Sequence, residues 1–499
     1  MNTPLVTSTD SQPIVLDGTA HGAPEWVRHA VFYEIFPDRF AKSDRVAKPT
    51  NLERWEDKPT LYGFKGGDLI GIVEKLDYLQ ELGVNAIYLT PIFQSTANHR
   101  YHTHDYFQVD PILGGTPAFR TLLDEAHARG MRIIIDGVFN HASRGFYQFS
   151  HALENGAASP YLDWFYIHGF PLHAYEGRAQ YDCWWGIPAL PKLNIKNPAV
   201  REFIYQVAQH WTRFGVDGWR LDVPAEIDDD AFWQEFRRRV RAVNPQAYLV
   251  GEIWHEAQRW LQGDQFDAVM NYLFARACIG FFIGDALDVQ LTQHVGYAPI
   301  PTLDGTQFAR ELNRLLSLYS DAVNKVQFNL LGSHDTARLI SLARGDASAV
   351  KLAMLCLLTY PGTPCIYYGD EMGMAGSKDP DCRRAVIWDR STWNLEIFDW
   401  TRRAIALRHA HRALRDGTFR IVFAANKAIA YLREHEGEQM LVVFNVAFHS
   451  NTFAIPLAGV VQSSKQLRPV FGKPLQLEQA QSIAHIRLAA RDAVVLQWV

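Results

Sequence analysis

Three carboxylate residues and one arginine occur where catalysis could use them. Arg220 and Asp222 are separated by a single leucine in the apolar segment FGVDGWRLDVPAE. If that segment is a strand, alternate side chains point the same way, so Arg220 and Asp222 face one side together. Glu252 and Asp335 lie in two further segments that combine apolar and polar residues, LVGEIWH and LLGSHDTAR. The pair of Arg220 and Asp222 is either a structural ion pair at a strand end or part of a reactive site.

Glycoside cleavage would account for these side chains together. It needs one ionised carboxylate as nucleophile and one protonated carboxyl group as acid, in environments that separate their pKa values. Arg220 would keep Asp222 ionised, and the apolar neighbours of Glu252 would raise the pKa of that carboxyl group. The sugar hydroxyls and the developing oxocarbenium ion would then be held by Asp335, His141 and His334. Several charged groups at one site would otherwise cost stability, which favours the reactive interpretation.

The elements that must position these residues alternate along the chain from Ala30 onward. Short segments rich in β-branched and aromatic residues are separated by amphipathic segments, such as LIGIVEKLDYLQELG and PAFRTLLDEAHARG. This alternation predicts a parallel (β/α)8 TIM barrel, whose functional residues gather at the C-terminal ends of the strands. The expected strands are AVFYEIF, VNAIYLTP, MRIIIDGVF, VDGWRLDV, AYLVGEIW, FDAVMNY, KVQFNLLGS and PCIYYGD. The three carboxylates would follow the fourth, fifth and seventh strands and converge on one rim.

Changes in pattern divide the chain into predicted domains. An aromatic-rich excursion punctuated by Gly and Pro follows the third strand, and loops of such length usually carry function. Short alternating runs such as RIVFAA and MLVVFNVAF predict an antiparallel β-sandwich at the C-terminus. The expected parts are a flexible N-terminal segment 1–24, the barrel in 25–140 and 201–412, an inserted domain 141–200, and the β-sandwich 413–499.

Composition restricts the class of protein. The 499 residues, 48% hydrophobic and 21% charged, can form one large core and a smaller domain. The net charge of -5 argues against nucleic acid as a partner. Five scattered cysteines without a CxxC pair predict reduced thiols, and KLAMLCLLTY is too short to span a bilayer and predicts a buried helix. Since the first residues show no secretory signal, we expect a cytoplasmic protein without a membrane partner.

As a set, the segments DGVFNH, GWRLDV, GEIW and GSHDT resemble the α-amylase family, in the family's order and from about Val31 to the C-terminus. The resemblance implies that Asp222 is the nucleophile, Glu252 the acid/base and Asp335 the transition-state stabiliser. It also implies a group of sugar-binding neighbours, among which the ring of Tyr101 in NHRYHTHDYF would stack on the sugar whose bond is broken. The other members of that group are Arg220, His141, His334, His99 and Asp105. A packing role is the alternative for Tyr101.

Further motifs resemble a narrower group, the neopullulanases, cyclomaltodextrinases and maltogenic amylases. They are LPKLN, DVPAE with Glu226, GEIWH with Trp254 and His255, and KDPDCRRAVIW near Asp379. The resemblance implies a retaining hydrolase of α-1,4-linked glucans, acting on cyclodextrins, pullulan and maltooligosaccharides with some transglycosylation.

Several alternatives to that activity remain. The same three carboxylates also serve α-1,6-glucosidases, sucrose-active enzymes and glucan transferases. A catalytically inactive scaffold is another alternative, although it would be expected to lack one of the carboxylates. A metal hydrolase is a further one, but the histidines lack the paired spacing of a zinc site.

Two properties of that group are not expected here. Most of its members carry an N-terminal β domain that covers the partner's active site in a dimer, whereas this predicted barrel begins almost at once, so monomer and homodimer both remain open. The group's calcium loop would fall near AKSDRVAKPTNLERWED, which offers Asp44 and Asp57. Calcium generally takes about six to eight oxygen ligands. We therefore predict no required metal, and the expected binding partner is an oligosaccharide or polysaccharide substrate.

Overall fold

The computed structural model describes residues 22–457, 466–480 and 483–499. The segment 1–24, predicted to be flexible, lies outside the described residues except for its last three. Within the described residues, eight parallel strands close into a barrel in the order β1-β10-β9-β8-β7-β6-β5-β2. The strands are β1(Phe32–Ile35), β2(Ala86–Leu89), β5(Arg132–Gly137), β6(Gly218–Leu221), β7(Tyr248–Gly251), β8(Ala268–Asn271), β9(Phe328–Asn329) and β10(Thr363–Tyr367). Seven of these strands lie within a segment predicted as a strand, and β10 begins one residue before its predicted segment, so the predicted TIM barrel is confirmed.

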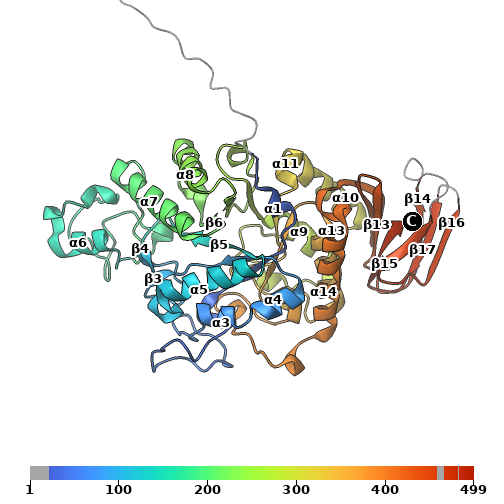
Figure 1. Cartoon of the computed structure of the whole chain (residues 1–499), viewed down its shortest axis with the longest axis horizontal. Helices are drawn as coiled ribbons and strands as arrows, with labels where there is room; N and C mark the ends of the chain where they lie inside the picture. The colour runs from blue at the N-terminus through green and yellow to red at the C-terminus, as the bar shows by residue number, and fades with distance from the viewer. Residues whose placement is uncertain (1–21, 458–465, 481–482) are drawn as a thin grey trace, which may run out of the picture.

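Helices surround this barrel (Figure 1). The predicted helical segment 69–83 forms two helices rather than one, because the backbone leaves the helical conformation at Lys75, with φ −113° and ψ 6°. Its predicted glycine stop is present, since Gly83 ends α4 in the left-handed conformation that suits glycine. The helices are α1(Glu25–Arg28), α2(Pro37–Phe40), α3(Leu69–Val73), α4(Leu76–Leu82), α5(Gly115–Ala128), α6(Tyr147–Asn155), α7(Pro198–Phe214), α8(Asp230–Val243), α9(Tyr272–Cys278), α10(Gly305–Ser317), α11(Asp321–Asn324), α12(Leu339–Leu342), α13(Ala347–Thr359), α14(Leu395–Ala410) and α15(Arg412–Asp416).

The register between β6 and β7 places two of the carboxylates side by side. Arg220 pairs with Val250, and the following residues of the two strands pair in turn. Asp222 and Glu252 are therefore the next residues after a matched pair of neighbouring strand ends. The two strands approach closely at Gly218, where an added Cβ atom would lie 2.2 Å from the carbonyl oxygen of Tyr248.

Two irregular segments cover the C-terminal end of the barrel. The hairpin β3(Phe93–Ser95) and β4(Thr103–Val109) follows β2 and carries the NHRYHTHDYF segment. After β5 the chain makes an excursion that includes α6, and it returns to the barrel at α7 (Figure 1). An isolated antiparallel bridge between His141 and Lys192 ties the two ends of this excursion together.

The C-terminal region forms antiparallel sheets, consistent with the predicted β-sandwich. Its described residues make a sheet of order β11-β12-β13-β18-β15 and a sheet of order β14-β17-β16, with a shared apolar core between them. The strands are β11(Thr418–Ala425), β12(Ala428–His435), β13(Glu438–Asn445), β14(Asn451–Pro456), β15(Leu467–Phe471), β16(Gln476–Ala480), β17(Ile483–Leu488) and β18(Asp492–Trp498).

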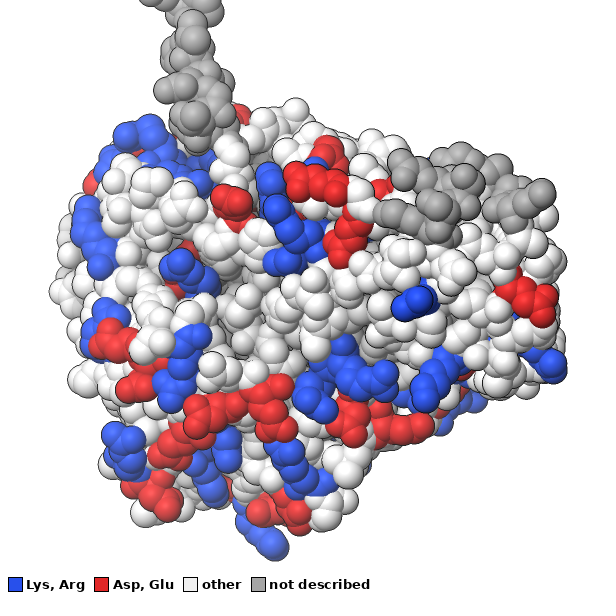
Figure 2. Space-filling view, turned by 45° about the vertical axis from the view of Figure 1, so that its right-hand side comes forward, with Lys and Arg blue, Asp and Glu red and all other residues white. Residues whose placement is uncertain are grey.

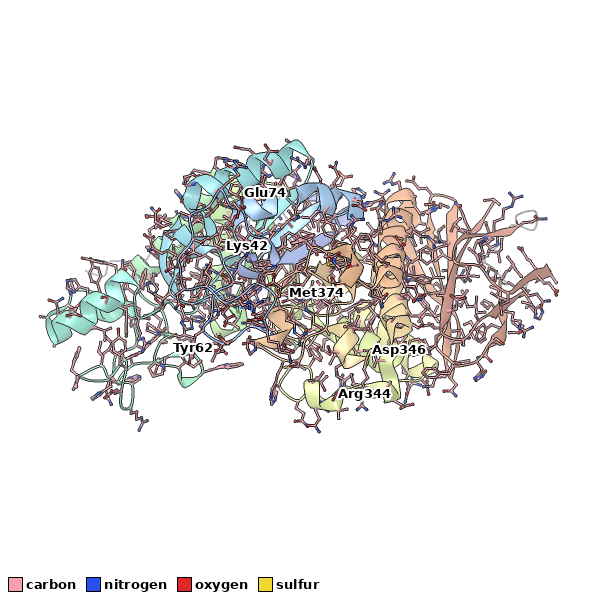
Figure 3. The ribbon with its side chains drawn as sticks, turned by 90° about the horizontal axis from the view of Figure 1, so that it is seen from below. Lys42, Tyr62, Glu74, Arg344, Asp346 and Met374 are labelled. Carbon is pink, nitrogen blue, oxygen red and sulfur yellow. The ribbon has the colours of Figure 1, made fainter. Side chains whose placement is uncertain are left out.

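The barrel and the C-terminal sheets meet along α13 and α14 (Figure 1). Most residues of α13 are buried, as predicted for the segment KLAMLCLLTY. At the same junction Asp346, labelled in Figure 3, caps α13 and lies 2.6 Å from the guanidinium of Arg491. An apolar helix and an ion pair therefore connect the two domains.

The surface and the thiols match the composition. Basic and acidic side chains are interspersed on the face shown in Figure 2. All five cysteines lie among the described residues, where none forms a disulfide and four are buried. None of the helices in the described ranges combines the length and apolar character that crossing a membrane requires.

Candidate active site

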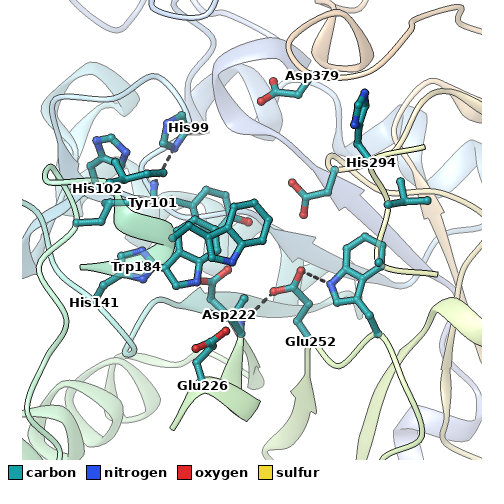
Figure 4. Close-up of a pocket in the computed structure, with 18 of the residues that line it drawn as sticks. His99, Tyr101, His102, His141, Trp184, Asp222, Glu226, Glu252, His294 and Asp379 are labelled. Atoms are coloured by element: carbon teal, nitrogen blue, oxygen red, sulfur yellow. Dashed lines mark hydrogen bonds between the residues drawn. The ribbon is translucent and has the colours of Figure 1, made fainter. Parts of the chain in front are cut away.

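A cavity of about 680 Å³ opens at the C-terminal ends of the barrel strands (Figure 4). This volume lies in the range of small-molecule sites. Asp222, Glu252 and Asp335 all line it, each directly after or close after its strand. Seven more of the predicted site residues share the cavity: His99, Tyr101, His141, Glu226, Trp254, His255 and Asp379. The structure thus brings together residues spread over some 280 positions of the sequence.

Arg220 lies fully buried beneath this cavity and contacts three carboxylates. Its Nη1 atom donates to both oxygens of Asp136 at 2.8 Å and to Oδ1 of Asp222 at 3.0 Å. Its Nη2 atom lies 2.9 Å from Oε2 of Glu252. Arg220 and Asp222 are therefore not an isolated pair, because one cation is shared among three acids.

Glu252 has the environment of a proton donor. Burial raises the pKa of its carboxyl group, and Arg220 opposes this rise without cancelling it. The two oxygens are held separately, since the Trp254 indole donates to Oε1 at 3.0 Å and the Val223 N–H donates to Oε2 at 3.0 Å. The predicted direction of the shift is correct, but Trp254 is a polar contact of Glu252 as well as an apolar neighbour.

The environment of Asp222 corrects one expectation. Burial raises the pKa of Asp222 well above its usual range, and Arg220 only partly offsets this effect. Glu252 and Asp136 share the cation with Asp222, and their negative charges raise the pKa of Asp222 further. The prediction that Arg220 keeps Asp222 ionised has the right sign but ignores the competing acids. Asp222 and Glu252 together retain a proton to higher pH than either carboxyl group would alone in water.

Asp335 is the one of the three carboxyl groups whose pKa is lowered. Burial favours its neutral form, but the positive charges of His334 and Arg383 outweigh burial and lower the pKa of Asp335. The Nη2 atom of Arg383 lies 3.0 Å from Oδ1 of Asp335, and Nε2 of His334 lies 3.1 Å from Oδ2. Arg383 also lies 3.1 Å from Asp379, and so links two of the predicted residues.

A hydrogen-bonded chain fixes the ring of Tyr101. Its hydroxyl group donates to Oδ2 of Asp136 at 2.9 Å and lies 2.6 Å from Nε2 of His334. The two rings are stacked with centroids 5.5 Å apart. On its other side, the His334 Nδ1 atom contacts Oε1 of Glu34 at 2.5 Å. Burial lowers the pKa of His334, but Asp335 and Glu34 raise it further, so the net shift is upward.

Burial keeps His99 and His141 neutral. Burial lowers the pKa of His141 to about 3. Burial and the nearby cation Arg383 lower the pKa of His99 well below its usual value. The Nδ1 atom of His99 accepts a hydrogen bond from the backbone N–H of Tyr101 at 3.1 Å. Neutral imidazole can both accept and donate hydrogen bonds, as a contact with sugar hydroxyl groups requires.

Three more predicted residues, Trp254, Glu226 and His255, line the wall of the cavity. The Trp254 ring stacks on Tyr272 with centroids 3.6 Å apart. Glu226 is partly exposed, and one of its oxygens lies 3.8 Å from Nζ of Lys192 in the LPKLN segment. His255 is exposed and contacts the backbone carbonyl of its neighbour Glu256.

Asp105 is not where the prediction placed it. It lines a different, smaller cavity with His104 and Gly145, and it does not line the cavity of the carboxylates. The carboxylate accepts a hydrogen bond from the backbone N–H of Phe107 at 2.7 Å, two residues along β4. The expectation that Asp105 lies beside Tyr101 in the sugar site is therefore corrected, since Asp105 and its strand partner Gln94 both line the smaller cavity.

Three contributors to the site were missed in the sequence. Glu34 and Asp136 lie inside β1 and β5, where all neighbours are also buried, so alternation gives no signal. The available signals were an acidic residue within an otherwise apolar barrel strand and, for Asp136, its place as the first residue of DGVFNH. Arg383 lies in the quoted segment KDPDCRRAVIW, but nothing in that segment points to Asp335.

The loop after β1 contains a buried carboxylate that pairs with a lysine. The buried carboxylate of Asp68 accepts hydrogen bonds from the N–H groups of Ser43 and Gly71, and its Oδ2 atom lies 2.8 Å from Nζ of Lys48. Lys48 also donates to the carbonyl oxygen of Ile112 at 3.0 Å. The ammonium group of Lys48 thus pairs with the buried carboxylate of Asp68, whereas Asp44 and Asp57 are both exposed. Within the described ranges, no group of three or more His, Cys, Asp or Glu side chains is arranged to hold a metal ion.

A family model described as "Alpha amylase, catalytic domain" matches residues 34–405. The chain belongs to the α-amylase family. A cyclomaltodextrinase from a Bacillus species is 46% identical to this α-amylase family member over 85% of this chain and 73% of its own length. Neopullulanase 2 from Thermoactinomyces vulgaris is 44% identical over 85% of this chain and 70% of its own length. Among solved structures, a Nostoc punctiforme debranching enzyme is 47% identical, with a TM-score of 0.89, over 95% of this chain and 99% of its own.

These comparisons identify the protein as a glycoside hydrolase. The match covers the barrel strands that carry Asp222, Glu252 and Asp335. The similarity to cyclomaltodextrinase and neopullulanase agrees with the resemblance of the LPKLN and GEIWH segments.

Proposed function

We propose that the protein is a retaining hydrolase of α-1,4-linked glucans that acts on cyclodextrins, pullulan and maltooligosaccharides and carries out some transglycosylation. The observation that carries the proposal is the position of Asp222 and Glu252 at adjacent strand ends, both in contact with Arg220 and both lining one cavity. Two carboxyl groups in this relation are the minimum that glycoside cleavage requires.

The proposed reaction begins with substrate bound in the cavity. Glu252 donates its proton to the glycosidic oxygen while an ionised Asp222 attacks the anomeric carbon, which forms a covalent β-glycosyl ester and releases the leaving group. The deprotonated Glu252 then takes a proton from water, which attacks the same carbon and expels Asp222. The second inversion restores the α configuration. A sugar acceptor in place of water gives transglycosylation.

The other residues act on the sugar rather than on the bond. Asp335, kept anionic by His334 and Arg383, stabilises positive charge on the ring in the oxocarbenium-like transition state. Tyr101, fixed by Asp136 and His334, stacks on the sugar that carries the bond. His99, His141 and Asp379 supply hydrogen bonds to its hydroxyl groups.

An α-1,6-glucosidase activity is the second candidate. It is favoured by the similarity to the Nostoc punctiforme debranching enzyme over nearly the whole chain. Pullulan separates the two candidates because it contains both linkages. Cleavage of its α-1,6 bonds yields maltotriose, whereas cleavage of its α-1,4 bonds yields a trisaccharide that keeps the α-1,6 bond.

The test is incubation with β-cyclodextrin, pullulan, starch and maltotriose, followed by chromatography of the products. We expect faster cleavage of β-cyclodextrin and maltooligosaccharides than of starch, with maltose and glucose as the main products. Faster attack on starch, or maltotriose as the product from pullulan, would contradict the α-1,4 assignment to small glucans.

Three further properties belong to the proposal. We infer that no metal is required, which is supported by the ammonium group of Lys48 beside Asp68. We also infer a cytoplasmic location, since unpaired thiols suit a reducing compartment. The protein acts as a monomer or a homodimer.

A further inference from the structure

Two adjacent tryptophans line the cavity but have no part in the reaction described above. Trp184 and Trp185 lie in the excursion between β5 and α7. They line the same cavity as the three carboxylates. The Trp185 side chain is 78% exposed, although tryptophan is among the residues most buried on average. A large exposed apolar ring inside a binding cavity indicates a contact surface for a ligand.

The two indoles form an ordered stack. Their ring planes are 12° apart with centroids separated by 4.6 Å. Trp184 in turn stacks on His141 with centroids 5.1 Å apart, and Figure 4 shows these two rings together at one side of the cavity. Since His141 is buried and its backbone is tied to Lys192 by the bridge, the outer ring of Trp185 rests on a rigid base.

The backbone at Trp185 is held in an unfavourable conformation. Its φ of 50° and ψ of 26° lie in the left-handed region, where a bulky side chain is an outlier. Hydrogen bonds on both sides enforce the turn, from the N–H of Trp184 to the carbonyl of Leu190 at 3.0 Å and from the N–H of Ile187 to the carbonyl of Trp184 at 2.9 Å. Strain that the surroundings enforce is characteristic of ligand-binding segments.

The inner part of the stack has hydrogen-bonding capacity to spare. The buried Nε1 atom of Trp184 and the buried Nε2 atom of His141 have no hydrogen-bond partner in the described part of the chain. Buried polar atoms without a partner are uncommon in folded proteins. A ligand rich in hydroxyl groups would supply the missing partners.

We propose that Trp185, supported by Trp184, forms a subsite for a glucose ring of the glucan other than the ring that Tyr101 contacts. The faces of a pyranose ring present C–H groups, which pack on the face of an indole, while the hydroxyl groups at the ring edge remain in water. The exposed side chains of Leu61 and Ile187 line the same cavity and extend this apolar surface. Trp185 is thereby a specificity-determining residue for longer and cyclic glucans, an inference that rests on the proposed function.

The test compares substrates that reach the subsite with one that does not. The variant Trp185→Ala should raise KM for maltohexaose and β-cyclodextrin about tenfold, equivalent to about 1.4 kcal/mol, and leave kcat within about twofold. Its kcat/KM for p-nitrophenyl α-glucoside, which has a single glucose ring, should be unchanged. The variant Trp185→Phe, which keeps an aromatic face, should retain most of the affinity for maltohexaose.

Tyr147→Ala provides the matched control. Tyr147 is another exposed aromatic residue of the same excursion, but it lines the smaller cavity that contains Asp105. Its removal should leave KM unchanged for all three substrates. Thermal denaturation of each variant verifies that the excursion remains folded.

Three outcomes would overturn the subsite. The first is that Trp185→Ala has the same KM as the wild-type protein for every substrate. The second is that Trp185→Ala loses kcat/KM equally on p-nitrophenyl α-glucoside and on maltohexaose. The third is that the substitution changes the oligomeric state without changing KM. The last would assign the exposed indole to contact with a second copy. Failure of the proposed function is a separate result, since the wild-type protein would then cleave none of the glucans.

Discussion

At the scale of single residues, the site is organised by the sharing of one cation among several acids. Arg220 contacts Asp136, Asp222 and Glu252, and none of these contacts is exposed to bulk water. Desolvation favours the neutral form of each of these buried carboxyl groups, so the nearby charges decide which acid keeps a proton and which loses it. Asp335, which contacts two positively charged groups, His334 and Arg383, has a lowered pKa and is on the ionised side. The spacing of Arg220 and Asp222 predicted their contact but not the competition from Asp136.

The acid role of Glu252 can be tested by replacing this residue with glutamine, its amide. Glu252→Gln removes the proton donor and should lower kcat for maltohexaose by about 10²–10⁴-fold, the usual contribution of general acid catalysis. A substrate with a good leaving group, such as 2,4-dinitrophenyl α-glucoside, needs no protonation and should still form the ester with Asp222. Asp222→Asn is the control and should lose activity on both substrates. Equal losses of Glu252→Gln on the two substrates would contradict the assignment.

The shared charge also predicts the pH dependence. The reaction needs Asp222 ionised and Glu252 protonated, so kcat/KM should fall at low pH as Asp222 gains a proton and at high pH as Glu252 loses one. Burial raises the pKa of both carboxyl groups, so both limbs should lie above the ordinary values of about 3.9 for Asp and about 4.3 for Glu.

The variant Asp136→Asn tests this interpretation. It removes a negative charge near Asp222, and it removes a competitor for the positive charge of Arg220. Both effects lower the pKa of Asp222. The acidic limb should therefore move to lower pH, as a pH series of initial rates would measure. An unchanged or raised acidic limb would show that Asp136 does not compete for Arg220.

At the scale of elements, the barrel strands were predictable and the loops were not. Periods of apolar residues located the eight strands because a buried parallel strand is nearly continuous in apolar side chains. The same property hid Glu34 and Asp136, since every residue around them is buried whichever way it points. Asp105 was misplaced because the chain turns at β3 and β4 in a way that no local pattern specifies. The stack of Trp184 and Trp185 depends on a left-handed turn, which the sequence WWG does not reveal.

The loop after β1 gives a prediction about metal dependence. A buried Asp68 is balanced by Lys48, so Lys48→Ala leaves a buried charge without its partner and should lower the free energy of unfolding by about 3–5 kcal/mol. Removing the exposed Lys42 of the same loop, labelled in Figure 3, should change it by about 0.5 kcal/mol or less. Urea denaturation measures both.

A chelator completes this test. Treatment of the wild-type protein with EDTA should change neither its melting temperature nor its activity, because the ammonium group of Lys48 already balances the buried carboxylate of Asp68. A fall in melting temperature with EDTA that added calcium reverses would show that a metal ion is required.

At the scale of the whole molecule, closure of the barrel sets the stereochemistry. Neighbouring strands lie about 4.8 Å apart, and Asp222 and Glu252 follow matched positions of the neighbouring strands β6 and β7. A retaining glycosidase needs its two carboxyl groups about 5 Å apart, whereas an inverting enzyme leaves about 6.5–9.5 Å for a water molecule. Adjacent strand ends therefore favour direct attack by Asp222.

The first product should accordingly be the α anomer. Attack by Asp222 on an α-linked glucose inverts the anomeric carbon once, and attack by water activated by Glu252 inverts it again. Proton NMR of a fresh maltohexaose digest, recorded before mutarotation, distinguishes the two anomers by their anomeric signals. The closed barrel holds both strands in this register, so the outcome should be the same for linear and cyclic glucans. Initial release of the β anomer would require a water molecule between the two carboxyl groups, which would exclude Asp222 as the nucleophile.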